Sequence, residues 1–122
     1  MAETLYNRIG GDIALGAAVE ILYGKIIADD RINGYFENVD MQKQARKMKS
    51  FLSYAFGADT PFTGESLRVS HEKLVANGLN DLHFDAVKEH IQSTLKELNV
   101  ADELTQEVMI ITESTRNDVL NR

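Results

Sequence analysis

The chain has 122 residues, of which 43% are hydrophobic and 26% are charged, and this composition predicts a single globular domain over residues 1–122. It has no cysteine, which excludes disulfides and thiolate chemistry, and its formal net charge of -6 argues against binding to nucleic acid. Because we find neither a signal-peptide pattern nor an apolar run long enough to span a bilayer, we expect a cytoplasmic protein with no membrane partner.

Apolar residues recur at helical spacing along nearly the whole chain, so the predicted fold class is all-α. Gly10 and Gly11 are expected to end a first short helix, and Asp12 is expected to cap the next one. Asp40 and Asp81 are expected to open two further helices, and residues 57–64 to form a loop. In chain order the predicted helices cover about residues 5–9, 12–28, 41–56 and 65–76, one from Asp81 with the stripe Phe84, Val87, Ile91, Leu95 and Leu98, and a last one through Leu104, Val108, Ile111 and Val119.

Two polar residues of the third predicted helix fall among hydrophobic ones. Helical spacing puts Gln44 and Lys47 on the same side as Met48, Phe51 and Leu52. Gln44 can also lie at the polar edge of this stripe, and Lys47 can bury its stem while its ammonium group reaches water. Each residue alone therefore has an ordinary structural interpretation.

His71 shares one side of its helix with Leu67, Leu74 and Val75, so its imidazole is predicted to point inward. Taken alone, such a histidine is more often a core residue bonded to a carbonyl than a metal ligand. Tyr23, at the edge of the second helix's apolar stripe, is equally ordinary for an amphipathic side chain. In combination, one inward imidazole and a separate face with Tyr, Gln and Lys fit an apolar slot with a ligand on one side and hydrogen-bond donors on the other.

The other two histidines do not complete a metal site made by protein side chains alone. His83 and His90 are seven residues apart with no second pair of Cys or His nearby, whereas zinc sites take three or four ligands. We interpret both as solvent-exposed or helix-capping residues. Sequence motifs for a serine nucleophile, a phosphate loop or a dinucleotide site are not found.

Several segments, in order along the chain, resemble one family. They are LYNRIGGD at 5–12, DDRINGYFENVDMQKQ at 29–44, FLSYAFG at 51–57, HEKLV at 71–75 and HFDAV at 83–87, and DVLN at 118–121 is similar to cyanobacterial members. By these segments the chain resembles the group I truncated haemoglobins. The resemblance covers essentially the whole chain and implies the truncated globin fold, a two-over-two helical sandwich around haem.

The resemblance implies a role for each candidate site residue. His71 matches the proximal ligand of the haem iron, Tyr23 matches the distal tyrosine that hydrogen bonds to bound oxygen, and Gln44 matches the distal glutamine position. The residues that match the wall of the haem pocket are Phe36, Met48, Phe51, Leu52 and Leu67.

Three positions bear on how this chain varies within the family. Met48 stands where many members have Gln or Leu, so a second hydrogen-bonding amide is expected to be absent. Lys47 stands where some relatives use His or Lys as a second iron ligand, which makes Lys47 a candidate distal ligand. Thr115 stands where some relatives carry a histidine that links covalently to haem, so we expect non-covalent haem b.

The predicted function is reversible binding of O2, and of NO and CO, by a monomeric haem protein. Oxidation of NO to nitrate, sustained by a reductase, is a candidate activity that the sequence does not separate from storage. Two alternatives stay open. One is electron transfer by a six-coordinate haem with Lys47 on the iron, and the other is a cofactor-free helical interaction domain in which His71 is a core residue.

Overall fold

The computed structural model describes residues 5–37, 39–57 and 64–122, and every regular element within these ranges is helical. This confirms the all-α prediction. The elements are α1 (Leu5–Arg8), α2 (Gly11–Ile27), the 3-10 helix η1 (Asn33–Phe36), α3 (Met41–Ala55), α4 (Gly64–Ala76), α5 (Asp81–Glu97), α6 (Asp102–Ser114) and α7 (Arg116–Val119). Of these helices, none is long and apolar enough to cross a membrane.

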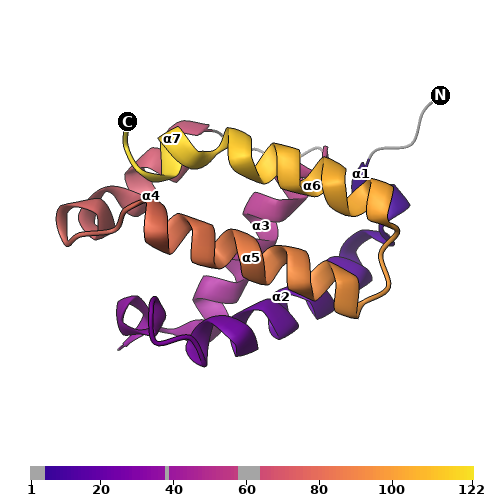
Figure 1. The fold of residues 1–122 in the computed structure, drawn as a ribbon, viewed down its shortest axis with the longest axis horizontal. Coiled ribbons are helices and arrows are strands. Elements are labelled where there is room, and N and C mark those ends of the chain that lie inside the picture. The colour runs from indigo at the N-terminus through magenta and orange to yellow at the C-terminus, as the bar shows by residue number, and fades with distance from the viewer. Residues whose placement is uncertain (1–4, 38, 58–63) are drawn as a thin grey trace.

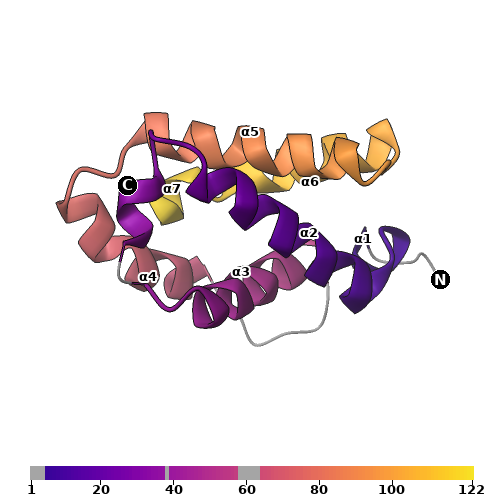
Figure 2. The same ribbon diagram turned by 90° about the horizontal axis from the view of Figure 1, so that it is seen from below.

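Two pairs of long helices form the body of the fold. Helices α5 and α6 run side by side, while α2 packs against both α3 and α5 (Figure 1). Seen from below, α2 crosses between the α5–α6 pair and a layer made by α3 and α4 (Figure 2). The arrangement is a sandwich of the α2–α3 pair against the α5–α6 pair, with α4 and α7 together at one end.

The core is built on α2. Leu15, Leu22 and Ile26 follow each other at spacings of seven and four residues, so they share one face of the helix. All three are at most 2% exposed, and Val108 of α6 is fully buried in the same cluster. The predicted α2 stripe is confirmed, but Tyr23, which we expected at its edge, is buried as well.

The N-terminal cap predicted for α2 is wrong. The helix already begins at Gly11, and its capping residue is Gly10, so Asp12 lies in the first turn instead. Gly10 has a φ of 113°, and a Cβ there would come within 2.8 Å of the Cβ of Ala14. The chain can therefore make this sharp turn only with glycine, and no side-chain cap is needed to set where α2 begins.

The other helix boundaries agree with the sequence in part. Asp40 caps α3 as predicted, since its carboxylate accepts hydrogen bonds from the backbone N–H groups of Gln42 and Lys43. The last predicted helix is divided in two at Thr115, whose hydroxyl donates to the carbonyl of Thr112. Helix α4 begins at Gly64, which we had assigned to the preceding loop, and the rest of that loop, residues 58–63, lies outside the described residues.

Candidate functional site

Two buried side-chain hydroxyls, those of Tyr23 and Thr105, have no hydrogen-bond partner among the described residues, and that of Tyr23 lies near Gln44. The side chain of Tyr23 is 7% exposed, and its oxygen forms no hydrogen bond with any described residue. The side chain of Gln44 interacts with this hydroxyl, but outside the geometry of a normal hydrogen bond. Burial raises the pKa of Tyr23 above its ordinary value, and Gln44 offsets part of that rise. The hydroxyl is therefore a protonated donor for which no described residue provides a hydrogen bond of normal geometry.

Apolar side chains surround this hydroxyl. The ring of Phe36, on η1, meets the ring of Tyr23 edge to face, with 5.7 Å between centroids and 75° between planes. Leu52 is buried in the same cluster, and three of the predicted pocket-wall residues are half-buried and pack against that cluster. These half-buried residues are Phe36, Met48 and Phe51. The structure thus brings four of the five predicted pocket-wall residues, from η1 and α3, to the core cluster that contains Tyr23, whereas Leu67 of α4 is buried outside this cluster.

Gln44 and Lys47 of α3 are separated by the structure although helical spacing places them on one side. Gln44 is half-buried and faces Tyr23, whereas Lys47 is exposed to solvent. The exposure of Lys47 agrees with the alternative in which its ammonium group reaches water. A lysine stem is long enough to leave the apolar side of a helix and keep its ammonium group in water.

His71 lies half-buried on α4, one turn after the buried Leu67. Its Nδ1 is 2.8 Å from the carbonyl oxygen of Leu67, so Nδ1–H donates to that carbonyl. No described residue hydrogen bonds to Nε2. Burial lowers the pKa of His71, with a smaller opposing effect from the Leu67 carbonyl. The imidazole is thus neutral at pH 7 and presents an unprotonated Nε2, which is the tautomer that a metal ion requires.

A polar cluster at the corner after α2 was not predicted. Arg31 contacts both carboxylate oxygens of Asp29, and Nε2 of His90 lies 2.6 Å from the same carboxylate. Hydrogen bonds from Arg31 first, and from His90 second, hold the pKa of Asp29 well below its usual range. His90 is half-buried, so its interpretation as an exposed or capping residue is wrong. His83 does cap α5, because its Nδ1 accepts from the backbone N–H of Asn80.

These features match the needs of a flat, apolar cofactor that carries one metal ion. A porphyrin supplies four equatorial ligands itself, so one neutral imidazole is enough to anchor its iron. His71 provides that imidazole, with its second nitrogen already committed to a carbonyl. The unpartnered Tyr23 hydroxyl provides a donor for a polar ligand. The residues present therefore fit haem.

Comparison with known proteins gives the family. A sequence model described as bacterial-like globin matches residues 4–121. Group 1 truncated hemoglobin GlbN of Synechocystis sp. is 43% identical over 98% of this chain and 99% of its own length. A group 1 truncated hemoglobin from Tetrahymena pyriformis is 36% identical, over 98% of this chain and 97% of that protein.

Solved structures agree. The 2/2 hemoglobin from Synechococcus sp. PCC 7002, in the cyanomet state and with covalently attached heme, superimposes with a TM-score of 0.93 at 49% identity, covering 98% of this chain and 100% of that one. Chlamydomonas reinhardtii THB1 superimposes with a TM-score of 0.85 at 43% identity, covering 98% of each chain. The chain belongs to the group 1 truncated hemoglobins, and its function is haem-based ligand binding.

Proposed function

We propose that this chain holds haem b through His71 and reversibly binds O2, as well as NO and CO, on the side of Tyr23 and Gln44. One observation carries the proposal, namely the buried Tyr23 hydroxyl without a partner. Leaving such a group unsatisfied costs about 1–3 kcal/mol, which a polar ligand beside it would recover. Haem held by His71 would supply an iron that binds a diatomic gas reversibly.

His71 serves this function by holding its ring in one orientation and one tautomer. The Leu67 carbonyl accepts a hydrogen bond from Nδ1–H, which leaves the lone pair of Nε2 available. Histidines that ligate metals usually donate their other N–H to a carbonyl or carboxylate, which fixes the ring and raises its basicity. The lowered pKa keeps His71 neutral at physiological pH, so no proton competes for Nε2.

Tyr23 serves the proposed function as a hydrogen-bond donor. Because burial raises its pKa, the hydroxyl stays protonated at neutral pH. A donor in an apolar pocket stabilises partial negative charge on a bound gas far better than a donor in water. Gln44 lies close enough to offer its side-chain amide as a second donor beside the hydroxyl. A gas that becomes polar when bound, such as O2, gains most from this pair.

The direct test is reconstitution of the purified protein with hemin. We expect uptake of one haem per chain with a Soret band, and reversible spectral changes of the reduced protein with O2 and with CO. Failure to take up hemin would contradict the proposal, and so would a reduced form whose spectrum does not change on addition of O2 or CO.

The haem is proposed to be non-covalent. The side chain of Thr115 is buried, and its hydroxyl donates to the carbonyl of Thr112 at 2.7 Å. It has no basic nitrogen that could attack a haem vinyl group, and its oxygen is engaged in the helix. The covalent attachment named for the Synechococcus protein is therefore not expected through this position.

Nitric oxide dioxygenase activity is a finer proposal on the same site. One NO, one O2 and one electron give nitrate, so each turnover oxidises the iron and requires a reductase to return the electron. The donors that retain O2 also keep it in place for attack by NO. Stopped-flow mixing of the oxygenated protein with NO is expected to give stoichiometric nitrate and ferric protein. Recovery of ferrous protein without nitrate would reject the activity.

Electron transfer by a six-coordinate haem needs Lys47 on the iron, and the described structure does not favour it. Lys47 is exposed to solvent, whereas Gln44 on the same helix is half-buried and faces Tyr23. A low-spin ferric spectrum that becomes high-spin in Lys47→Ala would favour this candidate, whereas an unchanged spectrum removes Lys47 from the iron. Membership of a haem-binding family leaves the cofactor-free alternative without support.

A further inference from the structure

Helix α4, which carries His71, has one main helical neighbour. Among the described residues, the helix that α4 contacts most is α7, and both views of the fold show the two together at one end of the molecule (Figures 1 and 2). The long core helices α2, α3, α5 and α6 pack mainly on one another. The orientation of α4 in the protein therefore depends on what holds it to α7.

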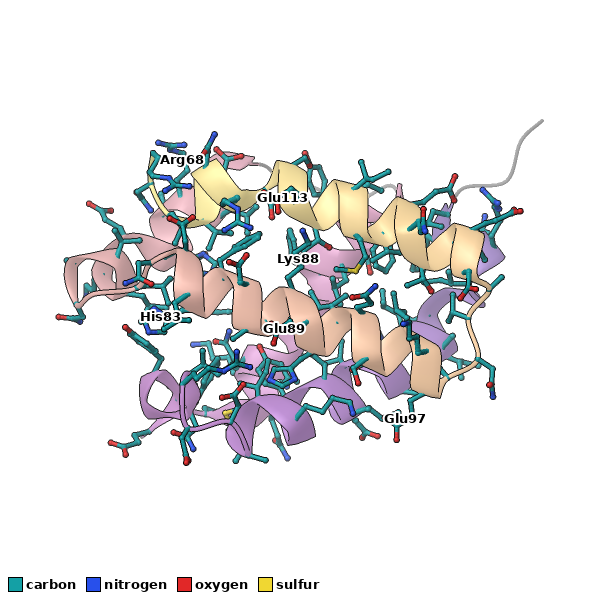
Figure 3. All side chains as sticks on the ribbon, in the orientation of Figure 1. Arg68, His83, Lys88, Glu89, Glu97 and Glu113 are labelled. Atoms are coloured by element: carbon teal, nitrogen blue, oxygen red, sulfur yellow. The ribbon has the colours of Figure 1, made fainter. Side chains whose placement is uncertain are left out.

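Arg68 of α4 is held by residues 118–122, which we call the latch segment. Its guanidinium donates to Asp118 at 2.9 Å and to the carbonyl of Arg122 at 3.1 Å. Figure 3 shows the labelled Arg68 beside this part of the chain. In return, the side-chain amide of Asn121 donates to the backbone carbonyl of Arg68 at 3.1 Å. Both the side chain and the backbone of Arg68 are thus fixed from the same segment.

The contact lies next to the carbonyl that orients His71. Leu67 and Arg68 are consecutive, and the Leu67 carbonyl accepts the Nδ1–H of His71 while the Arg68 carbonyl accepts from Asn121. A shift of the backbone at Arg68 would also move the neighbouring Leu67 carbonyl, and with it the hydrogen bond that orients the imidazole ring of His71. Asn121 has a φ of 58°, a left-handed conformation that Asn adopts more readily than most residues. That conformation aims its amide at α4.

Arg116, which lies just before the latch segment in the chain, anchors that segment on α5 and α6. The guanidinium of Arg116 pairs with Asp81 and Asp85 of α5 and with Glu113 of α6, and it lies 4.4 Å from the centroid of the Phe84 ring. Nearby, the labelled Lys88 and Glu113 face each other between α5 and α6 (Figure 3).

A second anchor comes from Arg122, which pairs with Asp81 at 2.9 Å. Because Asp81 also pairs with Arg116, one carboxylate ties both ends of this stretch to the start of α5. The segment that grips α4 is thus fixed to the body of the fold on its other side.

We propose that Asp118 and Asn121 are positioning residues, which hold α4 through Arg68 and thereby hold His71 in place for the haem iron. The inference rests on the proposed role of His71 as iron ligand. It gives the DVLN segment at 118–121 a function, since its two polar residues make the contacts to α4 while Leu120 is buried beneath them.

The test compares Asp118→Asn and Asn121→Gly with a matched control, Arg8→Ala. Asn removes the charge but keeps the shape of Asp118, and Gly accepts the left-handed backbone of residue 121. Arg8 makes an ion pair with Glu107 of similar exposure to that of Arg68 with Asp118, but it joins α1 to α6. Two quantities are measured: amide hydrogen exchange, helix by helix, in the haem-free and haem-loaded protein, and the rate at which haem transfers to an excess of an acceptor apoprotein.

We expect each latch variant to exchange α4 amides about three- to tenfold faster than the parent, with α2, α3 and α5 unchanged, and to release haem faster by a similar factor. Arg8→Ala should alter neither quantity. Unchanged α4 exchange, or equal acceleration in all helices, would overturn the proposal, and so would loosened α4 with unchanged haem release. A parent protein that takes up no haem would refute the proposed function instead, and the exchange of haem-free protein would still decide whether the latch holds α4.

Discussion

Replacement of Tyr23 by phenylalanine removes one atom whose role differs between the haem-free and the gas-bound protein. The ring stays, so its edge-to-face contact with Phe36 at 5.7 Å is kept and no cavity of methyl size is made. What disappears is a buried hydroxyl that no described residue satisfies. The account therefore predicts opposite effects on stability and on oxygen retention.

In the haem-free protein, Tyr23→Phe should raise the free energy of unfolding. A buried unsatisfied polar group costs about 1–3 kcal/mol, so its removal is expected to stabilise the protein by about 1 kcal/mol. Urea unfolding followed by circular dichroism measures this change. A loss of more than about 1 kcal/mol would mean that the hydroxyl has a partner in the folded protein, and the reasoning would be wrong.

In the haem-loaded protein, the same change should speed the release of oxygen. Loss of a hydrogen bond worth about 1–2 kcal/mol corresponds to about a five- to thirtyfold faster dissociation. Stopped-flow displacement of O2 by CO measures the rate. Tyr35→Phe is the matched control, because Tyr35 packs on His83 away from Tyr23 and should leave the rate unchanged. Equal rates for Tyr23→Phe and the parent would refute the role of this hydroxyl.

Three further measurements test the core, the ion pairs of Glu113 and the attachment of haem. Leu22→Ala empties a site that is 2% exposed and should cost about 2–5 kcal/mol of unfolding free energy in urea, and a cost below about 1 kcal/mol would contradict its place in the core. Arg116 and Lys88 lower the pKa of Glu113 from 4.5 to about 2, so the carboxylate stabilises the fold above pH 4.5 and this contribution is lost as the pH falls towards 2. The parent's urea midpoint should thus fall more steeply than that of Glu113→Gln over this range, and parallel curves would count against the ion pairs. When haem is extracted from the haem-loaded protein with acidified organic solvent, mass spectrometry should find the chain at its unmodified mass. A covalent haem adduct would contradict the expectation drawn from Thr115.

Sequence reasoning found the parts of the site that depend on local periodicity. The inward position of His71 and the closeness of Gln44 to the core follow from helical spacing, which is a property of neighbouring residues. For Lys47 the spacing left two alternatives open, and its exposure agrees with the one in which a long flexible stem carries the charge into water. Periodicity predicts on which side of the helix a residue lies, but it does not predict where the charged end of a long side chain lies.

Sequence reasoning could not predict contacts between residues that are far apart in the chain. His90 and Asp29 are 61 positions apart, and Arg68 and Asp118 are 50 apart, so no local pattern joins them. The start of α2 was misplaced because Asp12 has the right chemistry for a cap, while the conformation of Gly10 decides the matter. The break at Thr115 was missed because apolar spacing continues through it.

The imidazole of His71 is proposed to bond to haem iron, and chemical rescue is the decisive experiment for that bond. His71→Gly is reconstituted with hemin, and its absorption spectrum is recorded before and after addition of free imidazole, with circular dichroism as a control for folding. The account predicts that the variant loses the parent's Soret band and haem affinity and that imidazole restores the spectrum. A folded His71→Gly protein that binds haem with the parent's affinity and spectrum in the absence of imidazole would contradict it.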